Sequence, residues 1–388
     1  MILGAGRYQV PLIKASIELG IETHVCSILG DYPGIGLSDH FHEVDIASST
    51  DVLDLAQEIQ PDGIITTATD ICLKSIGLVV EKMNLPGSGY EASSSCLNKS
   101  LMKQKLVGAR VPTADYRVVE GVESALDFFN NLSSACVIKP ADSSGSRGVS
   151  KIVESSEIES AFESAKEYSK SGVVLIEEWL EGEEFGAQAV VENGQCKLLV
   201  VHSDVTTPPP RRIPVGHGCP HPNGMELQGM VQEMVNDAID AIGIDNTVSN
   251  IDFILTENGP KIIELTCRMG GTRLPEVCGT YWGIDFYTLA IQLALGDKIN
   301  IPATPQGKPN AAHNLILERE GKIISMDSVK ARFVHEVWFD AGDCVPLNVA
   351  RLAELGYIQL IQDGSSSILP DLIKEVNRVA GSVVLEED

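Results

Sequence analysis

Two strand-like apolar runs joined by a turn form the clearest pattern along the chain. They occupy residues 249–256 and 261–266, and the intervening Glu-Asn-Gly-Pro segment, residues 257–260, is typical of a hairpin turn. In an antiparallel pair, Asp252 on the first strand should face Glu264 on the second near the open end. Two facing carboxylates repel each other unless a cation lies between them, and hard oxygen ligands suit Mg²⁺ or Mn²⁺. The pattern therefore predicts a metal site on this hairpin.

A lysine and a Ser/Gly-rich loop lie upstream of the hairpin. Residues 137–140 form a short apolar run that contains Lys139, and residues 141–148 follow as the loop. Backbone N–H groups and hydroxyls of such a loop can hold phosphate oxygens, with Lys139 as a point charge beside them. The loop is not a P-loop, since the Gly-Lys-Ser/Thr ending is missing, and taken alone a flexible connector is its commoner role. The candidate phosphate-binding residues of the loop are Ser143, Ser144, Gly145, Ser146 and Gly148.

An apolar run at residues 173–176 leads into an acidic segment. Glu177 and Glu178 end the predicted strand, and Leu180 and Glu184 follow shortly after it. Acidic residues at a strand exit are usually only solvated. Here Glu184 can accept hydrogen bonds from ribose hydroxyls, and the backbone around Glu178 to Leu180 can bind an adenine edge.

The first 95 residues alternate short strand patterns with helical ones. The pattern predicts a helix over 8–19, a strand over 22–27, a helix over 50–59 and a strand over 63–67. This βαβ rhythm predicts a small doubly wound sheet. Gly4-x-Gly6 looks like part of a dinucleotide-binding turn, but the third glycine is absent, so it is weak evidence for NAD.

The remaining patterns divide the chain into domains of an α/β and α+β protein. We predict a doubly wound domain at 1–95, a linker helix within 96–112, a small lobe at 113–185, a larger lobe at 186–309 and a small α+β cap at 310–388. The cap should contain strands near 312–318, 334–339 and 382–385 and a helix near 369–380.

Residues 203–220 are the least regular segment. Three consecutive prolines at 208–210 predict a stiff, extended loop, because proline cannot join a central strand. His217 lies among prolines and glycines in this segment, a setting that suits a substrate-facing loop. His221, His40 and His42 are expected to be surface residues.

Composition narrows the classes of partner. Of the 388 residues, 29 are Lys or Arg and 54 are Asp or Glu, which gives a net charge of −25. This balance argues against nucleic acids and anionic membranes as partners. No apolar run reaches the length of a membrane span. The nine cysteines are scattered with no Cys-x-x-Cys pair, and several lie inside apolar segments, which predicts small buried residues in a reducing, cytoplasmic compartment.

The order of these features resembles the ATP-grasp superfamily, and in particular its carboxylate–amine ligases, such as L-amino acid ligases, and biotin-carboxylase-like proteins. The resemblance implies a doubly wound N-terminal domain, a two-lobed central domain with ATP between the lobes, and a C-terminal cap. It also implies ATP and Mg²⁺ as cofactors, and leaves a homodimer open. Its ordered features are Lys99, Lys139, the loop at 143–148, Glu177 to Leu180, Glu184, Asp252, Glu264 and Arg268.

The resemblance further implies roles for these residues. Lys99 and Lys139 would bind nucleotide phosphates, and Arg268 would stabilise an acyl-phosphate. Arg268 with the backbone of Gly270 and Gly271 would hold a substrate carboxylate. The family commonly has Asn where this chain has Thr266, and a hydroxyl is a weaker metal ligand than an amide oxygen. Metal ligation by Thr266 is therefore doubtful.

The predicted reaction is ATP-dependent ligation of a small-molecule carboxylate, preferably an amino acid, to an amine, with release of ADP and phosphate. Three alternatives stay open. One is a bicarbonate-using carboxylase or a carbamoyl-phosphate-like enzyme, and another is a nucleotide-binding protein without catalysis. The third, an NAD-dependent oxidoreductase, is disfavoured because it leaves Lys139, Glu184 and the two hairpin carboxylates unexplained.

Overall fold

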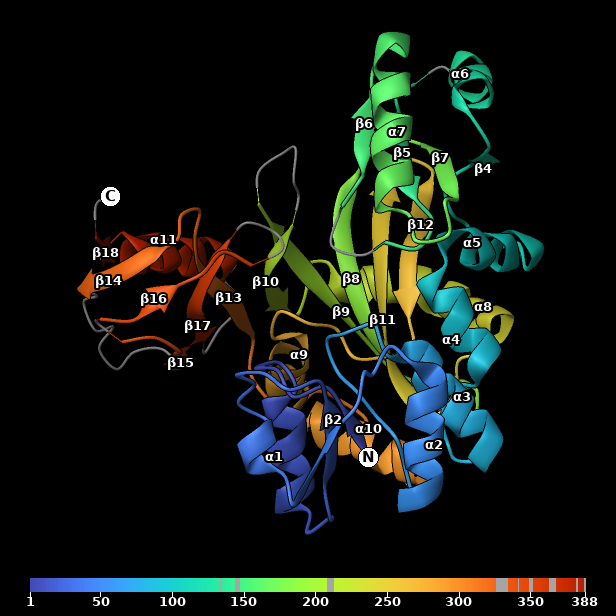
Figure 1. The fold of residues 1–388 in the computed structure, drawn as a ribbon. Helices are drawn as coiled ribbons and strands as arrows, with labels where there is room; N and C mark the ends of the chain where they lie inside the picture. Colours follow the sequence, from blue (N-terminus) through green and yellow to red (C-terminus); the bar gives the residue numbers. More distant parts are fainter. Residues whose placement is uncertain are drawn as a thin grey trace. The chain divides into compact units, whose positions relative to one another are not determined.

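The structure is a computed structural model that forms two compact units (Figure 1). The first unit comprises residues 1–199, 225–271 and 287–300, and the second comprises 200–224, 272–286 and 301–388. The residues described are 1–132, 134–143, 147–207, 213–325, 334–340, 342–348, 352–362, 368–381 and 383–386. None of the helices in these ranges is both long and apolar enough to cross a membrane.

The N-terminal part of the first unit has a three-stranded parallel sheet in the order β1-β2-β3. The predicted strand at 63–67 is wrong: Ile65 forms only one parallel bridge, to Ile2. The next residues leave the ladder, because the Thr66 hydroxyl donates to the Leu3 carbonyl and the Gln9 side chain donates to the Thr67 carbonyl. The elements are β1 (Ile2–Leu3), α1 (Val10–Glu18), β2 (His24–Ser27), η1 (Ile35–Leu37), β3 (His40–Glu43), α2 (Ser49–Ile59), α3 (Leu73–Met83) and α4 (Tyr90–Leu97).

A second sheet of the first unit is four-stranded and antiparallel, in the order β4-β7-β5-β6. Helix α7 runs beside it in Figure 1 and packs Ile158, Phe162 and Ala165 into its core. These residues recur every three to four positions and so share one face of the helix. The elements are α5 (Lys99–Gly108), β4 (Tyr116–Val119), α6 (Val122–Asn130), β5 (Cys136–Pro140), β6 (Ser150–Ile152), η2 (Ser155–Glu157), α7 (Ile158–Tyr168) and β7 (Val174–Glu178).

The third sheet of the first unit contains the predicted hairpin. Its strands follow the order β12-β11-β8-β9, and Asp252 pairs directly with Glu264 across β11 and β12, as predicted. Both strands are longer than expected, so Asp252 lies in the middle of its strand. The elements are β8 (Glu183–Glu192), β9 (Gln195–Thr206), α8 (Gly224–Ile242), β11 (Thr247–Thr256), β12 (Gly259–Thr266) and α10 (Phe286–Leu295).

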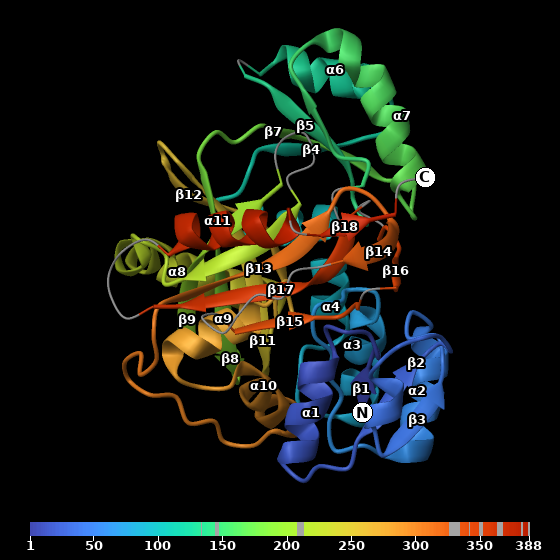
Figure 2. The ribbon, with the colours of Figure 1, turned by 90° about the vertical axis from the view of Figure 1, so that its left-hand side faces the viewer.

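The second unit begins within β9 and continues the antiparallel order β9-β10-β13-β17-β15. Helix α11 lies across β13 and β17 (Figure 2) and buries Leu372, Val376 and Val379. Strands β16, β14 and β18 form a separate small sheet. The elements are β10 (Pro214–Cys219), α9 (Leu274–Trp282), β13 (Asn310–Leu317), β14 (Gly321–Ser325), β15 (Val334–Val337), β16 (Cys344–Val345), β17 (Ala353–Ile361), α11 (Leu369–Ala380) and β18 (Val384–Leu385).

The predicted loop over 203–220 is wrong for most of its length. Strand β9 continues to Thr206, and residues 214–219 form β10, which is paired on both edges. The glycines that suggested a loop serve close packing instead. A Cβ atom at Gly216 would lie 2.7 Å from the Ala312 carbonyl oxygen, and one at Gly218 would lie 2.9 Å from the Leu369 side chain. The prolines at 208–210 lie outside the described residues.

Candidate active site

Lys139 is buried in the first unit as part of a network of three charges. Its Nζ lies 2.8 Å from Glu177 Oε1, and Lys103 Nζ lies 3.2 Å from Glu177 Oε2. Lys103 also donates to the Thr113 hydroxyl over 2.8 Å. Burial alone would raise the pKa of Glu177, but the two lysines outweigh it and lower that pKa. Glu177 thus holds Lys139 in place. The predicted roles of both residues in ATP binding stay predictions.

Lys103 is the member of this network that the sequence did not single out. Burial disfavours its charge and lowers its pKa to about 8, although Glu177 acts in the opposite direction. Helix α5 also carries Lys99 and Lys105, and nothing local shows that Lys103 is the fully buried one. The spacing Lys99-x-x-x-Lys103 places both lysines on one helical face, which is the only hint available.

We expect the free energy of unfolding of the wild type to rise relative to that of Lys103→Met as the pH rises from 8 to 10. The unfolded chain binds more protons than the folded one between the folded pKa of about 8 and the ordinary value of 10.5. The relative gain should be about 2 kcal/mol across this window. Urea denaturation of both proteins at each pH measures it, and a constant difference would show that Lys103 does not titrate there.

Glu178 is the next residue along β7 and makes a different set of contacts. Its Oε1 accepts from the backbone N–H of Asp115 at 3.0 Å and from Lys261, and its own N–H donates to the Asp115 carbonyl. These contacts hold the end of β7 beside the metal hairpin, since Lys261 lies on β12. The predicted roles of Glu178 and Leu180 toward adenine stay predictions. Glu184, on β8, lies in register with Ile254 of β11, and its ribose-binding role also stays a prediction.

Lys99 connects the predicted phosphate-binding loop with the hairpin that carries the predicted metal ligands. It begins α5, where the Asn98 side chain accepts from the N–H groups of Ser100 and Leu101 and caps the helix. Lys99 Nζ lies 3.0 Å from Glu264 Oε1 and donates to the Ser143 carbonyl oxygen at 3.0 Å. Burial disfavours its charge, but Glu264 and Asp70 outweigh that cost and raise its pKa. The structure thus brings together three residues that the sequence proposed separately.

The loop after β5 is described only at its ends. Gly148 has a φ of +70°, a conformation that favours glycine, and a Cβ atom there would lie 3.1 Å from Tyr168. Ser144, Gly145 and Ser146 lie outside the described residues, so their predicted contacts with phosphate stay predictions.

Two amide side chains, Asn250 and Gln188, form a chain of hydrogen bonds that ends at Asp252. Asn250 donates to Asp252 Oδ1 over 3.0 Å, and Gln188 donates to Asn250 Oδ1. Gln188 Oε1 accepts from the backbone N–H of Gly270 at 3.0 Å. Asn250 and Gln188 were missed by the sequence analysis. Asn250 lies two residues before Asp252 and thus on the same strand face, which is the signal that could have found it.

Arg268 is paired with Asp70, which the sequence analysis also missed. Its Nε donates to Asp70 Oδ1 at 2.8 Å and its Nη2 donates to Asp70 Oδ2 at 2.9 Å. Burial would lower the pKa of Arg268, but Asp70, Asp252 and Glu264 outweigh it and raise that pKa. No local signal connects residues 70 and 268. Asp70 fixes the direction of the guanidinium, since two parallel hydrogen bonds define a plane.

Asp70 also explains the local role of Thr266. The Thr266 hydroxyl donates to Asp70 Oδ1 over 3.1 Å, so its proton is engaged within the protein. Its ligation of a metal stays a doubtful prediction. The predicted carboxylate-binding role of the Gly270 and Gly271 backbone also stays a prediction, and Gln188 is the present partner of the Gly270 N–H group.

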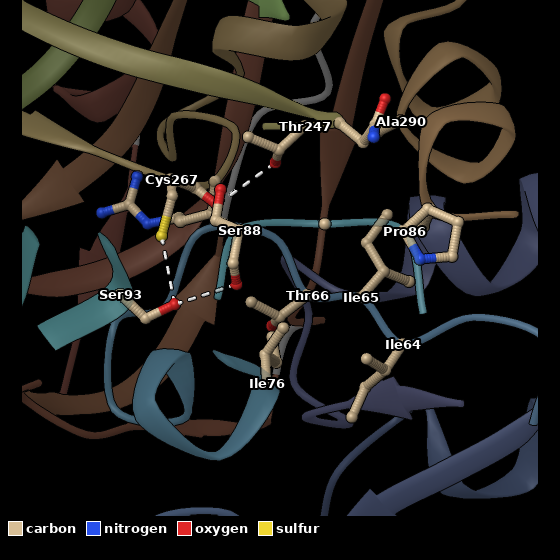
Figure 3. A pocket seen from close by; sticks show the side chains of 14 residues that line it. Ile64, Ile65, Thr66, Ile76, Pro86, Ser88, Ser93, Thr247, Cys267 and Ala290 are labelled. Atoms are coloured by element: carbon tan, nitrogen blue, oxygen red, sulfur yellow. Dashed lines mark hydrogen bonds between the residues drawn. The ribbon is translucent and has the colours of Figure 1, made fainter. Parts of the chain in front are cut away.

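A small pocket lies within the first unit (Figure 3). Cys267 and Arg268 line it together with apolar residues of the N-terminal part, including Ile64 and Ile76. The Cys267 thiol donates to the Ser93 hydroxyl, which in turn donates to the Ser88 carbonyl. Cys267 is buried, as predicted for a packing residue. None of the predicted phosphate-binding lysines lines this pocket.

The Gln9 side chain lies against the Gly4-x-Gly6 turn. Gln9 Oε1 accepts from the Gly6 N–H, and Gln9 Nε2 donates to the Thr67 carbonyl. A Cβ atom at Gly4 would lie 3.1 Å from the Gln9 side chain. The glycines therefore accommodate Gln9, which removes the main observation in favour of NAD.

His217 lies in the second unit, on β10, where it is buried. Its Nδ1 lies 2.6 Å from Asp204 Oδ1 on the neighbouring strand β9. Burial lowers the pKa of His217, although the hydrogen bond to Asp204 acts in the opposite direction. The predicted substrate role of His217 stays a prediction.

Comparisons with known proteins agree with this arrangement. Residues 96–272 match a family model described as an ATP-grasp domain. The chain is 26% identical over 269 residues to the uncharacterized protein y4rH of Sinorhizobium fredii, a match that covers 68% of this chain and 55% of y4rH. It is 26% identical over 238 residues to the D-alanine–D-alanine ligase of Geobacter sulfurreducens, which covers 59% of this chain and 74% of that ligase.

Two solved structures extend the likeness to the whole chain. Phosphoribosylglycinamide synthetase from Anaerococcus prevotii is 26% identical with a TM-score of 0.80, covering 100% of this chain and 98% of that one. L-amino acid ligase from Bacillus licheniformis has a TM-score of 0.79 with the same coverage, but at 17% identity this likeness concerns the fold alone. The chain therefore carries an ATP-grasp domain and has the ATP-grasp fold, as the sequence resemblance implied.

Proposed function

We propose that this protein is an ADP-forming ligase that joins a carboxylate to an amine at the expense of ATP. The observation that carries the proposal is the contact of Lys99 with Glu264, 3.0 Å apart, because a lysine that could bind a phosphate there lies beside the facing carboxylates of the hairpin. Arg268 is close enough to both carboxylates to be affected electrostatically by them. A D-alanine–D-alanine ligase among the relatives supports the same class of reaction.

The residues suit phosphoryl transfer followed by acyl transfer. A carboxylate oxygen attacks the γ-phosphorus, the bond to the β–γ bridging oxygen breaks, and ADP leaves with that electron pair. The amine nitrogen then attacks the acyl carbon, phosphate leaves, and the nitrogen loses a proton. Such reactions need charge neutralisation more than a nucleophilic side chain. Lys99 and Lys139 would neutralise the phosphates, and Asp252 and Glu264 would hold a Mg²⁺ ion that supplies further positive charge to the transferring phosphoryl group.

We further propose that the activated substrate is an amino acid. Arg268 presents a fixed guanidinium that matches a carboxylate with two parallel hydrogen bonds, and Asp70 occupies that position in the structure. A substrate carboxylate would compete for the same donors. A sugar acid or another small carboxylate would satisfy the same groups, so a substrate screen has to include both.

A phosphate-release screen with MgATP over pairs of amino acids, other carboxylates and amines tests the proposal. We expect release of ADP and phosphate that depends on both a carboxylate and an amine. Release with bicarbonate alone would instead indicate a carboxylase, whereas stabilisation by MgATP without any turnover would indicate a nucleotide-binding protein. A thermal shift with NADH but not with MgATP would overturn the proposal, since a ligand stabilises the folded state to which it binds.

Replacing Asp252 with Asn should raise the Mg²⁺ concentration needed for half-maximal turnover by about 10- to 100-fold, by analogy with the loss of groups that tune a metal site. The amide keeps the side-chain shape but removes the negative charge that faces Glu264. Glu257→Gln is a matched control, because Glu257 is exposed at the turn of the same hairpin. An unchanged Mg²⁺ dependence in Asp252→Asn would exclude Asp252 as a ligand.

A further inference from the structure

His202, Asp204 and His217 form a buried cluster within the second unit. His202 and Asp204 lie two residues apart on β9, so their side chains share one face of the sheet. His217 on β10 is the direct register partner of Asp204 and so projects to that same face. One potential ligand atom from each of the three residues lies within 4.8 Å of the others. None of these residues belongs to the proposed ATP site.

One carboxylate oxygen connects both imidazole rings. Asp204 Oδ1 lies 3.0 Å from His202 Nδ1 and 2.6 Å from His217 Nδ1. Both histidines are nearly fully buried, and the Nε2 atom of each has no hydrogen-bond partner among the residues that the structure describes. The three potential ligand atoms thus converge on one buried point within the second unit, which is the arrangement that a metal site requires.

We propose that His202, Asp204 and His217 bind one divalent transition-metal ion of the zinc type. Two imidazole nitrogens and one carboxylate oxygen are a ligand set typical of first-row transition metals, whereas Mg²⁺ prefers oxygen ligands alone. Ligand atoms bound to zinc at about 2.0–2.2 Å lie roughly 3 Å or slightly more apart, so the cluster needs only a small opening to admit the ion. Three protein ligands leave at least one coordination position for water or another small ligand.

Metal binding changes which nitrogen of each imidazole ring carries a proton. A ring nitrogen that binds the ion does so through its lone pair, so a proton on that nitrogen moves to the other ring nitrogen of the same neutral imidazole. A charged imidazolium would release its proton to solvent instead. The ion replaces the N–H···O hydrogen bonds to Asp204 with direct bonds to the nitrogens and to the carboxylate.

A second cluster, Glu22, His24 and His40, has a similar composition but lies in the first unit. Glu22 and His40 are exposed, with His40 Nε2 2.8 Å from Glu22 Oε1. An exposed cluster of this kind can take up metal ions weakly without being organised for them. It therefore supplies the matched control for the buried cluster.

The first experiment uses the wild-type chain without ATP, so it is independent of the proposed ligase activity. After treatment with a chelator and dialysis, the protein is titrated with Co²⁺ and Zn²⁺. We expect one tightly bound ion per chain, the visible absorption of Co²⁺ with nitrogen ligands, and a higher melting temperature with Zn²⁺ but not with the same concentration of Mg²⁺. Absence of a tight Co²⁺ or Zn²⁺ site in the wild type would overturn the proposal.

Variants then locate the site. We expect Asp204→Asn and His202→Gln to weaken binding of that ion by about 100-fold or more. Loss of a residue that only supports a metal ligand costs up to about 100-fold in affinity, and loss of a ligand itself should cost at least as much. His24→Asn combined with His40→Asn should leave binding of the ion unchanged. Asp204→Asn keeps a hydrogen-bond acceptor between the two rings, so circular dichroism and the apo melting temperature show whether the variant is folded. The opposite pattern, loss only in the His24/His40 variant, would place the ion at the exposed cluster and refute the proposal.

Discussion

Replacing Arg268 with Ala is expected to lower the turnover number of the ligase reaction about 10²- to 10³-fold, in line with the loss of one preorganised donor to a developing negative charge. The guanidinium is placed by two hydrogen bonds to Asp70 and is held fully charged by Asp70, Asp252 and Glu264. Single-turnover measurements of ADP formation and of product formation separate the two chemical steps. Near-normal rates for both steps in Arg268→Ala would remove its proposed role.

Two controls separate catalysis from a structural effect of that substitution. Arg268→Lys keeps the positive charge but cannot make the two parallel hydrogen bonds, so we expect only partial recovery. Asp70→Asn keeps the side-chain shape and one acceptor, so its turnover should fall less than that of Arg268→Ala. If Asp70→Asn were as inactive as Arg268→Ala while its melting temperature matched the wild type, the pair would act as one unit, and Asp70 would share the role of Arg268.

Replacing Glu177 with Gln is expected to lower the free energy of unfolding by about 3 kcal/mol or more, as is typical when one partner of a buried ion pair is removed. The reason is that Lys139 and Lys103 would stay buried without their shared anion. Urea denaturation without nucleotide measures this loss of free energy. The network lies in the first unit, so the unfolding transition of that unit should shift to a lower urea concentration.

Glu178→Gln is the matched control for this prediction. Glu178 is the next residue on the same strand and pairs with Lys261, but both side chains are partly exposed. We expect a loss of about 1 kcal/mol or less, the range of ion pairs at the surface. Equal losses in the two variants would contradict the view that burial of the Lys103–Glu177–Lys139 network sets the effect.

Local patterns in the sequence were sufficient for the hairpin with its two facing carboxylates and for the order of the candidate site elements. Turn residues 257–260 between two apolar runs specify a hairpin, and the two-residue repeat of a strand then determines that Asp252 faces Glu264. The resemblance to ATP-grasp proteins rested on the same short segments, and the comparisons confirmed it for the fold. Helices α2, α5 and α11 also followed from their periodicity.

Only the tertiary structure decided which charges meet. Asp70 and Arg268 are 198 positions apart, and Lys103 reaches Glu177 across 74 positions, so no periodicity within a segment relates them. The prediction of a loop around His217 was wrong for the same reason. Residues 214–219 form strand β10 because they pair with β9 and β13. Side-chain patterns encode which face of an element is buried, whereas the partner across that face is chosen when distant elements pack together. The sequence alone therefore determined the hairpin and its carboxylates, and the packed chain determined the partners that hold Arg268, Lys139 and His217 in place.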